Sequence, residues 1–168
     1  MRVVLRSLVC ALSCAAVFST AAKAEEATVI YKSLTVDVAL EAARAALQQC
    51  RTDGYQVTVV VLDRFGEPQV LLRDRFAGLP SIDIARDKAW TAIGFRSSTS
   101  QLGTSVKNGA IEPRLAQMPR MAMFGGGLII ETADTLLGGI GVSGAPGGDK
   151  DEKCARAGID AIRDKLDF

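Results

Sequence analysis

Glycine is concentrated in one part of the chain, and this feature constrains the fold most strongly. Nine of the 16 glycines lie between Gly125 and Gly148, within and around two apolar runs at residues 128–131 and 135–142. Glycine disfavours a helix interior, so we expect the two runs to form a β-hairpin connected by residues 132–134. Glycines in such strands are expected where another backbone or a ligand approaches closely.

A helix and a second hairpin are predicted in the first half of the chain. Apolar side chains recur at helical spacing over residues 35–51, which predicts a helix with Thr35 as its N-cap. A β-branched run at residues 56–62 and a return at residues 68–73 predict two antiparallel strands.

Further helical segments are predicted on both sides of the glycine-rich hairpin. One is expected over residues 81–94, with Ser81 as its N-cap, and a last one over residues 149–166. Residues 97–120 are expected to form short helical pieces. The breaks between these pieces are predicted at Gly103, Gly109, Pro113 and Pro119.

This order of elements predicts the fold class. We expect an α+β fold, a single-domain α/β sandwich with a central antiparallel sheet covered by the N- and C-terminal helices. A chain of 168 residues suits one domain, and it contains no internal repeat or long linker that would divide it.

The start of the chain has the three parts of a secretory signal peptide. A basic segment with two arginines precedes an apolar run at residues 8–18, and an A-x-A cleavage motif ends at Ala24. We expect residues 1–24 to be the signal peptide, cleaved after Ala24, and residues 25–168 to be the mature domain. The mature protein is then expected to be periplasmic or secreted.

The charge of the mature domain indicates which partners to expect. Loss of the leader removes three basic residues and no acid, which changes the formal net charge from +1 to about −2. No basic block remains that would indicate nucleic-acid binding. No other stretch approaches the ~20 apolar residues of a membrane span. We therefore expect no nucleic-acid partner, and no membrane contact after cleavage.

The chain contains no histidine. This excludes Ser-His-Asp and Cys-His catalysis, imidazole zinc sites and a haem held by a histidine of this chain. No pair of carboxylates stands out from the other surface acids. No conventional catalytic residues are therefore predicted.

Two cysteines remain after cleavage, Cys50 and Cys154, and both lie on the core-facing stripes of predicted helices. In an exported protein they could form a disulfide if the first and last helices pack side by side. Alternatively, they are two small buried apolar residues. The sequence leaves both interpretations open.

Residues 139–144 match G-x-G-x-x-G, the dinucleotide-binding fingerprint. That fingerprint opens a helix directly and leads to a second strand bearing an acid. Here Pro146 and two further glycines intervene, and only one helix follows. We therefore interpret the match as a glycine-rich strand end.

Three ordered motifs extend over most of the mature chain. The first comprises RDRFAG at residues 73–78, SIDIA at 81–85 and KAWTA at 88–92; the second comprises GGGLII at 125–130 and GGIGVSGA at 138–145; the third comprises GDKDE at 148–152 and CARAG at 154–158. Together these motifs resemble those of the GlcG/HbpS-like haem-binding family, which includes the C-terminal domain of PduO-type proteins. The similarity covers about residues 34–166.

The resemblance carries expectations about fold and ligand. It implies a compact α/β sandwich with a central antiparallel sheet, in agreement with the order of elements. It also implies homo-oligomers whose ligand sites lie near subunit contacts. Extracytoplasmic members bind haem, and some are linked to haem degradation or redox sensing. The implied cofactor is therefore haem, with its iron.

The resemblance also implies a haem site in this sequence. Thr99 is similar to a threonine associated with the iron in some members, so it is the expected metal ligand. Arg96 or Arg114 would bind the propionates. Because a neutral hydroxyl is a weak iron donor, we expect modest, exchangeable haem binding. Apolar walls would come from Phe76, Phe95, Met118 and Phe124.

Three hypotheses about function follow from these observations. The first is an exported haem-binding protein that acts in haem degradation or in redox or haem sensing. The second is an enzyme in which bound iron and peroxide degrade the haem while the protein positions it. The third is a non-haem protein that binds a small organic acid or has a structural role in an oligomer.

Overall fold

In this computed structural model, residues 27–166 are described, and those from Tyr31 onward belong to one compact unit. The expected signal peptide and its cleavage position lie outside the described residues. Within the described range, no helix is both long and apolar enough to cross a membrane.

The sheet consists of two hairpins, one formed by β1 (Thr58–Asp63) and β2 (Pro68–Arg73), the other by β3 (Gly127–Glu131) and β4 (Leu136–Ser143). The order of the four strands is β2-β1-β4-β3, and every neighbouring pair is antiparallel. The central strands β1 and β4 therefore come from different hairpins. Both predicted hairpins and the antiparallel sheet are confirmed.

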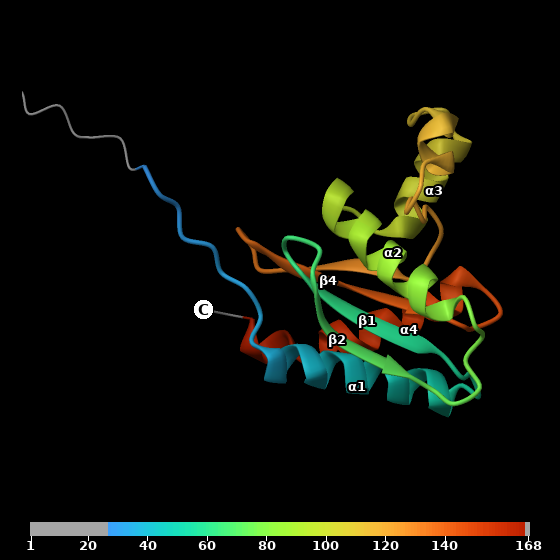
Figure 1. Cartoon of the computed structure of the whole chain (residues 1–168), viewed down its shortest axis with the longest axis horizontal. Helices are drawn as coiled ribbons and strands as arrows, with labels where there is room; N and C mark the ends of the chain where they lie inside the picture. Colours follow the sequence, from blue (N-terminus) through green and yellow to red (C-terminus); the bar gives the residue numbers. More distant parts are fainter. Residues whose placement is uncertain (1–26, 167–168) are drawn as a thin grey trace, which may run out of the picture. The chain divides into compact units, whose positions relative to one another are not determined.

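On one face of the sheet, α1 (Val36–Thr52) and α4 (Gly148–Asp160) pack side by side (Figure 1). Four alanines of α1 are fully buried, and these small side chains let α4 and the sheet approach closely. The buried residues of this core that come from the strands are Val59, Val61, Leu128, Ile130, Leu137, Ile140 and Val142.

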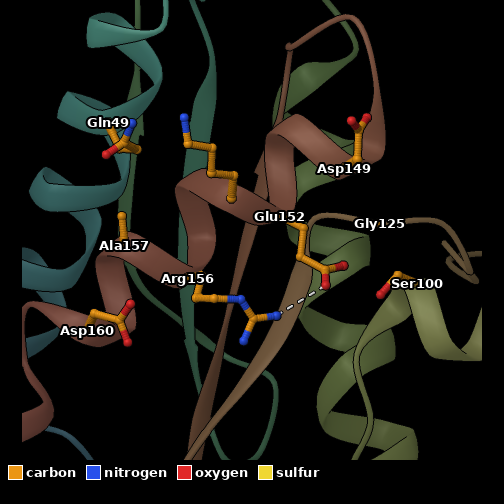
Figure 2. A pocket seen from close by; sticks show the side chains of 9 residues that line it. Gln49, Ser100, Gly125, Asp149, Glu152, Arg156, Ala157 and Asp160 are labelled. Carbon is orange, nitrogen blue, oxygen red and sulfur yellow. Dashed lines mark hydrogen bonds and ion pairs between the residues drawn. The ribbon is translucent and has the colours of Figure 1, made fainter.

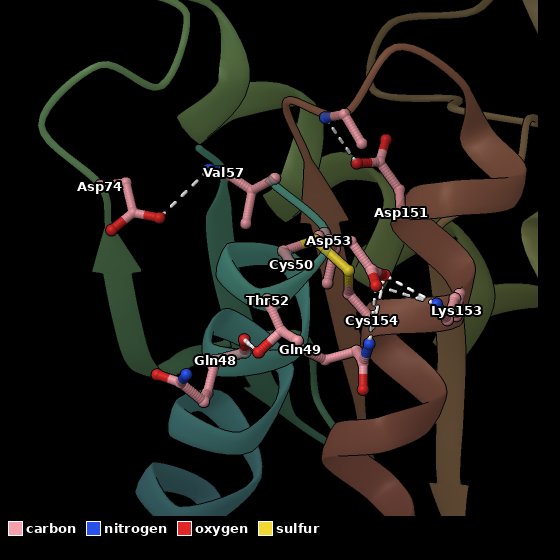
Figure 3. Close-up of a disulfide and its surroundings, with 12 residues drawn as sticks. Gln48, Gln49, Cys50, Thr52, Asp53, Val57, Asp74, Asp151, Lys153 and Cys154 are labelled. Atoms are coloured by element: carbon pink, nitrogen blue, oxygen red, sulfur yellow. Dashed lines mark hydrogen bonds and ion pairs between the residues drawn. A yellow bond between two sulfur atoms is a disulfide. The ribbon is translucent and has the colours of Figure 1, made fainter. Parts of the chain in front are cut away.

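A disulfide between Cys50 and Cys154 joins α1 to α4 (Figure 3). Their Cα atoms lie 5.5 Å apart, within the usual range for a disulfide, and both side chains are fully buried. Of the two interpretations that the sequence left open, the structure contains the disulfide. Beside it, Lys153 Nζ donates to the Asp53 carboxylate at 2.8 and 3.0 Å, so an ion pair accompanies the covalent link.

The opposite face of the sheet is covered by α2 (Ser81–Phe95), so the sheet lies between two helical layers. The predicted α+β fold with a central antiparallel sheet is confirmed. Close packing here requires glycine in β4. A Cβ on Gly141 would lie 1.9 Å from the carbonyl oxygen of Ala85 in α2. The G-x-G-x-x-G match therefore lies at the end of a strand that packs against a helix. This confirms its interpretation as a glycine-rich strand end.

Three short helices complete the described chain: α3 (Thr99–Lys107), η1 (Pro113–Gln117) and η2 (Arg163–Lys165). In Figure 1, α3 lies beyond α2, on the side of the sheet away from α1. The segment from α3 to η1 is the long connection between α2 and the second hairpin.

Three local predictions are wrong. Ser81 is the first residue of α2, with Pro80 at the cap position, and its hydroxyl donates to the Gly78 carbonyl instead. The third helix continues through Gly103, because one glycine costs a helix only about 1 kcal/mol. The last α-helix ends at Asp160, and a 3-10 turn follows it.

Candidate functional site

Lys88 is the largest fully buried side chain among the described residues. It lies on α2 with 1% of its surface exposed, and it borders a cavity of about 360 Å³. An ammonium group is rarely buried this completely unless it has specific partners. We call this cavity the lysine pocket; it is lined by Gly78, Pro80, Ser81, Ile84, Lys88, Phe124, residues 143–148 and Asp151.

The Lys88 ammonium group has two oxygen acceptors. Nζ donates to Asp151 Oδ2 at 2.7 Å and to the Val142 carbonyl oxygen at 2.9 Å. It also lies 4.8 Å from the centroid of the Phe124 ring, a cation–π contact. The other carboxylate oxygen of Asp151 accepts the N–H of Ala145 at 3.0 Å. The ion pair thus connects α2, β4, α4 and the glycine-rich loop before α4.

Burial shifts the protonation equilibria of both members of this pair. Desolvation lowers the pKa of Lys88 and raises the pKa of Asp151, while the attraction between the two charges opposes each shift. Titratable groups with shifted pKa values beside a cavity are typical of functional sites. Apolar side chains in place of a buried ion pair are often equally stable, so stability alone is a weak reason for this pair.

A glycine makes room for the ion pair. Gly126 has a φ of +119°, and a Cβ there would lie 2.7 Å from Lys88 Nζ and 2.8 Å from the Asp151 side chain. Any larger residue would displace one of the two charged groups. Part of the glycine-rich sequence is therefore required by the lysine pocket.

A second cavity, of about 440 Å³, lies where α2 ends and α3 begins. Arginines from three elements border it. Arg156 pairs with Glu152 and Arg163 with Asp160, whereas the Arg96 guanidinium has no ion-pair partner within residues 27–166. We call it the Arg96 cavity; it is lined by Arg96, Ser97, Ser98, Gln101, Leu128, Ile129, Glu131, Arg156, Ile159 and Arg163.

Arg96 also borders a third cavity, of about 400 Å³, whose lining is aromatic. Tyr31, Phe65 and Trp90 contribute to its walls. The Tyr31 and Phe65 rings meet edge to face with centroids 5.4 Å apart, and the Arg64 guanidinium lies 4.2 Å from the Tyr31 ring centroid. Arg96 is thus shared by a cationic cavity and an aromatic one.

The largest of the cavities described here, about 610 Å³, carries charges of both signs (Figure 2). Figure 2 shows the Glu152 carboxylate on the side facing Gly125 and Ser100, with Arg156 reaching toward it. One Glu152 oxygen is buried and has no hydrogen-bond partner among the described residues. Three acids border this cavity and no aromatic residue does, so it does not favour an apolar anion.

Thr99, the expected iron ligand, is fully buried at the first position of α3. Its Oγ1 accepts the N–H of Gly127 at 2.9 Å and lies 3.4 Å from the Gly127 carbonyl oxygen. The hydroxyl thus holds the start of β3, and Thr99 lines none of the four cavities described above.

The other predicted haem-site residues are distributed over several parts of the molecule. Arg96 lines two of the four cavities, and Phe124 lines the lysine pocket. None of the four is lined by more than one of the seven predicted residues. Besides Thr99, four of the seven line none of them: Phe76 in the exposed loop before α2, Phe95 at the end of α2, and Arg114 and Met118 on and just after η1.

The pairing of Lys88 with Asp151 was missed from the sequence. Each residue lies in one of the quoted motifs, but 63 positions separate them, so spacing did not connect them. A detectable signal was present in α2, where Lys88 adjoins the apolar positions Ala85 and Ala89 on the buried side of the helix.

Comparison with known proteins identifies relatives over most of the chain. A family model described as haem degrading protein HbpS-like matches residues 34–160. The corrinoid adenosyltransferase PduO of Salmonella typhimurium is 32% identical over 123 residues, which is 71% of this chain and 36% of that protein. The chain thus spans about a third of the length of this curated relative.

Solved structures share both sequence and fold with the chain. A double mutant of HbpS from Streptomyces reticuli has a TM-score of 0.76 and 34% identity, covering 94% of this chain and 98% of that one. A PduOC–haem complex has a TM-score of 0.72 and 30% identity, covering 77% of this chain and 95% of that one. Because the family model matches residues 34–160, which is most of the chain, the chain belongs to the family described as haem degrading protein HbpS-like.

Proposed function

We propose that this protein binds haem outside the cytoplasm. The observation that carries the proposal is the similarity to a chain crystallised as a haem complex, which this chain matches over nearly all of that chain's length. Export is supported by the signal-peptide pattern of residues 1–24 and by the disulfide, because such bonds persist in oxidising compartments.

The Arg96 cavity is the proposed binding place. Guanidinium groups form paired hydrogen bonds with carboxylates, so its three arginines suit the two propionates of a haem. Leu128 and Ile129 offer apolar contact for the porphyrin. The haem supplies the redox-active iron, while these residues bind and orient it.

The residues present suit the periphery of a haem better than its iron. The chain has no histidine, and the two cysteines beyond the leader form a disulfide. Thr99 remains the proposed iron-side residue; its hydroxyl would have to exchange its hydrogen bonds to Gly127. Binding should therefore be weak and exchangeable.

The protein is further proposed to act as a homo-oligomer. Phe76 and Met118 are 78% and 53% exposed in the single chain, which makes them available to a haem held near a subunit contact. This would bring together aromatic and arginine residues that one chain keeps apart.

Titration with haemin tests the proposal. Wild-type protein should develop a saturable Soret band, and Arg96→Gln should bind about fivefold more weakly, because an exposed bond to a charged group contributes about 1 kcal/mol. Arg44→Gln, on the exposed side of α1, is the matched control and should bind like wild type. A spectrum identical to free haemin would contradict haem binding, and equal affinity of both variants would remove Arg96 from the site.

Thr99 is tested by an isosteric pair of variants. If its oxygen contacts iron, Thr99→Val should change the absorption spectrum of the haem complex, and Thr99→Ser should restore it. An unchanged spectrum in Thr99→Val, together with lower stability, would leave Thr99 as a residue that only holds β3.

Degradation of the bound haem is the further activity that the family description indicates. It would appear as loss of the Soret band with release of iron when peroxide is added to the complex. A rate equal to that of free haemin with peroxide would contradict it.

A further inference from the structure

The lysine pocket lies away from the proposed haem site. Its contacts from α2 are Ser81, Ile84 and Lys88, in the first half of the helix, whereas Arg96 follows the last turn. The two cavities share no lining residue. Haem bound at the Arg96 cavity would leave the buried ion pair and its cavity unused.

Within residues 27–166, one N–H of the Lys88 ammonium group has no oxygen acceptor. An ammonium group has three N–H bonds, and those to Asp151 and Val142 account for two. The third has only the face of Phe124, a weaker partner than an anionic oxygen. A carboxylate in the cavity would therefore accept a strong hydrogen bond from the third N–H of the Lys88 ammonium group.

The charges around the pocket favour a singly charged ligand. Asp151 already balances Lys88, and the neighbouring acids Asp149 and Glu152 are paired with Lys150 and Arg156. The pocket thus offers one cation next to one anion, so the second negative charge of a dianion such as sulfate would face the Asp151 carboxylate and be repelled, whereas a monoanion would face Lys88 alone. The apolar walls suit a short hydrocarbon chain; they are Pro80, Ile84, Phe124, Ala145 and Pro146.

We propose that the lysine pocket binds a small monocarboxylate, which accepts a hydrogen bond from Lys88 and packs its hydrocarbon part against Phe124. The cavity volume of about 360 Å³ is near the lower end of ligand pockets, roughly 300–1,000 Å³. A short-chain acid fits within that volume. This site is additional to the proposed haem site and does not depend on it.

Calorimetric titration with three probes tests the ligand class. Butyrate should bind saturably, whereas its uncharged isostere butyramide and the dianion sulfate should not. Absence of saturable butyrate binding would overturn the proposal. Equal binding of butyramide would remove the role of charge, and equal binding of sulfate would overturn the assignment to a monoanion.

Two variants test whether binding occurs in this pocket. Lys88→Met with Asp151→Asn removes both charges but retains an acceptor for Ala145, and it should weaken butyrate binding at least about tenfold. Ile84→Trp fills the cavity without touching the ion pair, so it keeps the test decisive if the double variant does not fold. Unchanged butyrate affinity in a folded variant would overturn the proposal, while haemin titration of the same variants reports the separate haem site.

Discussion

The two faces of the sheet are composed differently. Under α1 and α4 the core is apolar, built mainly from alanine, leucine and valine, and a disulfide crosses between the helices. Under α2 the apolar core is smaller and is interrupted by buried polar side chains: Thr58, Ser81, Lys88, Thr91 and Ser143.

This difference indicates that one face of the sheet mainly stabilises the fold, whereas the other mainly serves ligand binding. Buried polar and charged groups cost free energy unless each is paired, so a face that keeps them next to a cavity has a use for them beyond stability. The core under α1 and α4 has the features of a structural layer. Both proposed ligand sites adjoin α2 or its C-terminal end, and α4 contributes Asp151 to one and Arg156 to the other.

The largest effect should come from removal of the disulfide. Its two cysteines are 104 positions apart, and a native cross-link over a loop of this length contributes about 4 kcal/mol. Cys50→Ala with Cys154→Ala should lose that much in denaturant unfolding and still bind haemin with wild-type affinity. A large loss of haemin affinity in the folded variant would show that the disulfide between α1 and α4 also supports haem binding, which contradicts the proposed division between the two faces.

Removal of Lys88 alone should be the next largest effect. Lys88→Met leaves Asp151 buried without its cation, which should cost about 3 kcal/mol near neutral pH. Loss of Lys88 raises the already elevated pKa of Asp151 further, so the folded variant takes up a proton more readily than the unfolded chain. Its stability deficit should therefore shrink as the pH falls from about 8 to about 5.

Unfolding curves of Lys88→Met and wild type across this pH range measure that prediction. A deficit that stays constant with pH would show that Asp151 does not carry an uncompensated charge in the variant. Lys107→Met is a suitable control, because Lys107 is exposed at the end of α3.

The smallest effect concerns the surface pair beside the disulfide. Hydrogen bonds from Lys153 and Gln49 lower the pKa of Asp53. In Lys153→Met the pKa of Asp53 should rise toward its ordinary value, as measured by NMR titration of the carboxyl carbon. An unchanged Asp53 titration would show that this ion pair does not form in solution.

The fold was predictable from sequence where local pattern decides it. Helical spacing before Cys50 and β-branched residues in β1 predicted elements that the structure confirms. The position of α2 on the second face was not predictable in the same way, because it depends on Gly141 allowing a helix to approach. Spacing alone does not show that two backbones meet.

The candidate sites were less predictable than the fold. Arg96 was identified from resemblance, and the structure places it at two cavities. The Lys88–Asp151 pair required the tertiary structure, since its members lie in different motifs and in helices on opposite faces of the sheet. They meet only where the Lys88 side chain reaches Asp151 in the first turn of α4. Burial of Thr99 beneath Gly127 likewise follows from packing rather than from local sequence.

Hydrogen–deuterium exchange with and without haemin tests most directly whether haem binds at the Arg96 cavity, away from α1 and from the lysine pocket. Exchange should slow at residues 96–102 and 127–131 when haemin is added. No change is expected along α1 or in the loop at residues 144–148. Slowing along α1, with residues 96–102 unaffected, would contradict haem binding at the Arg96 cavity.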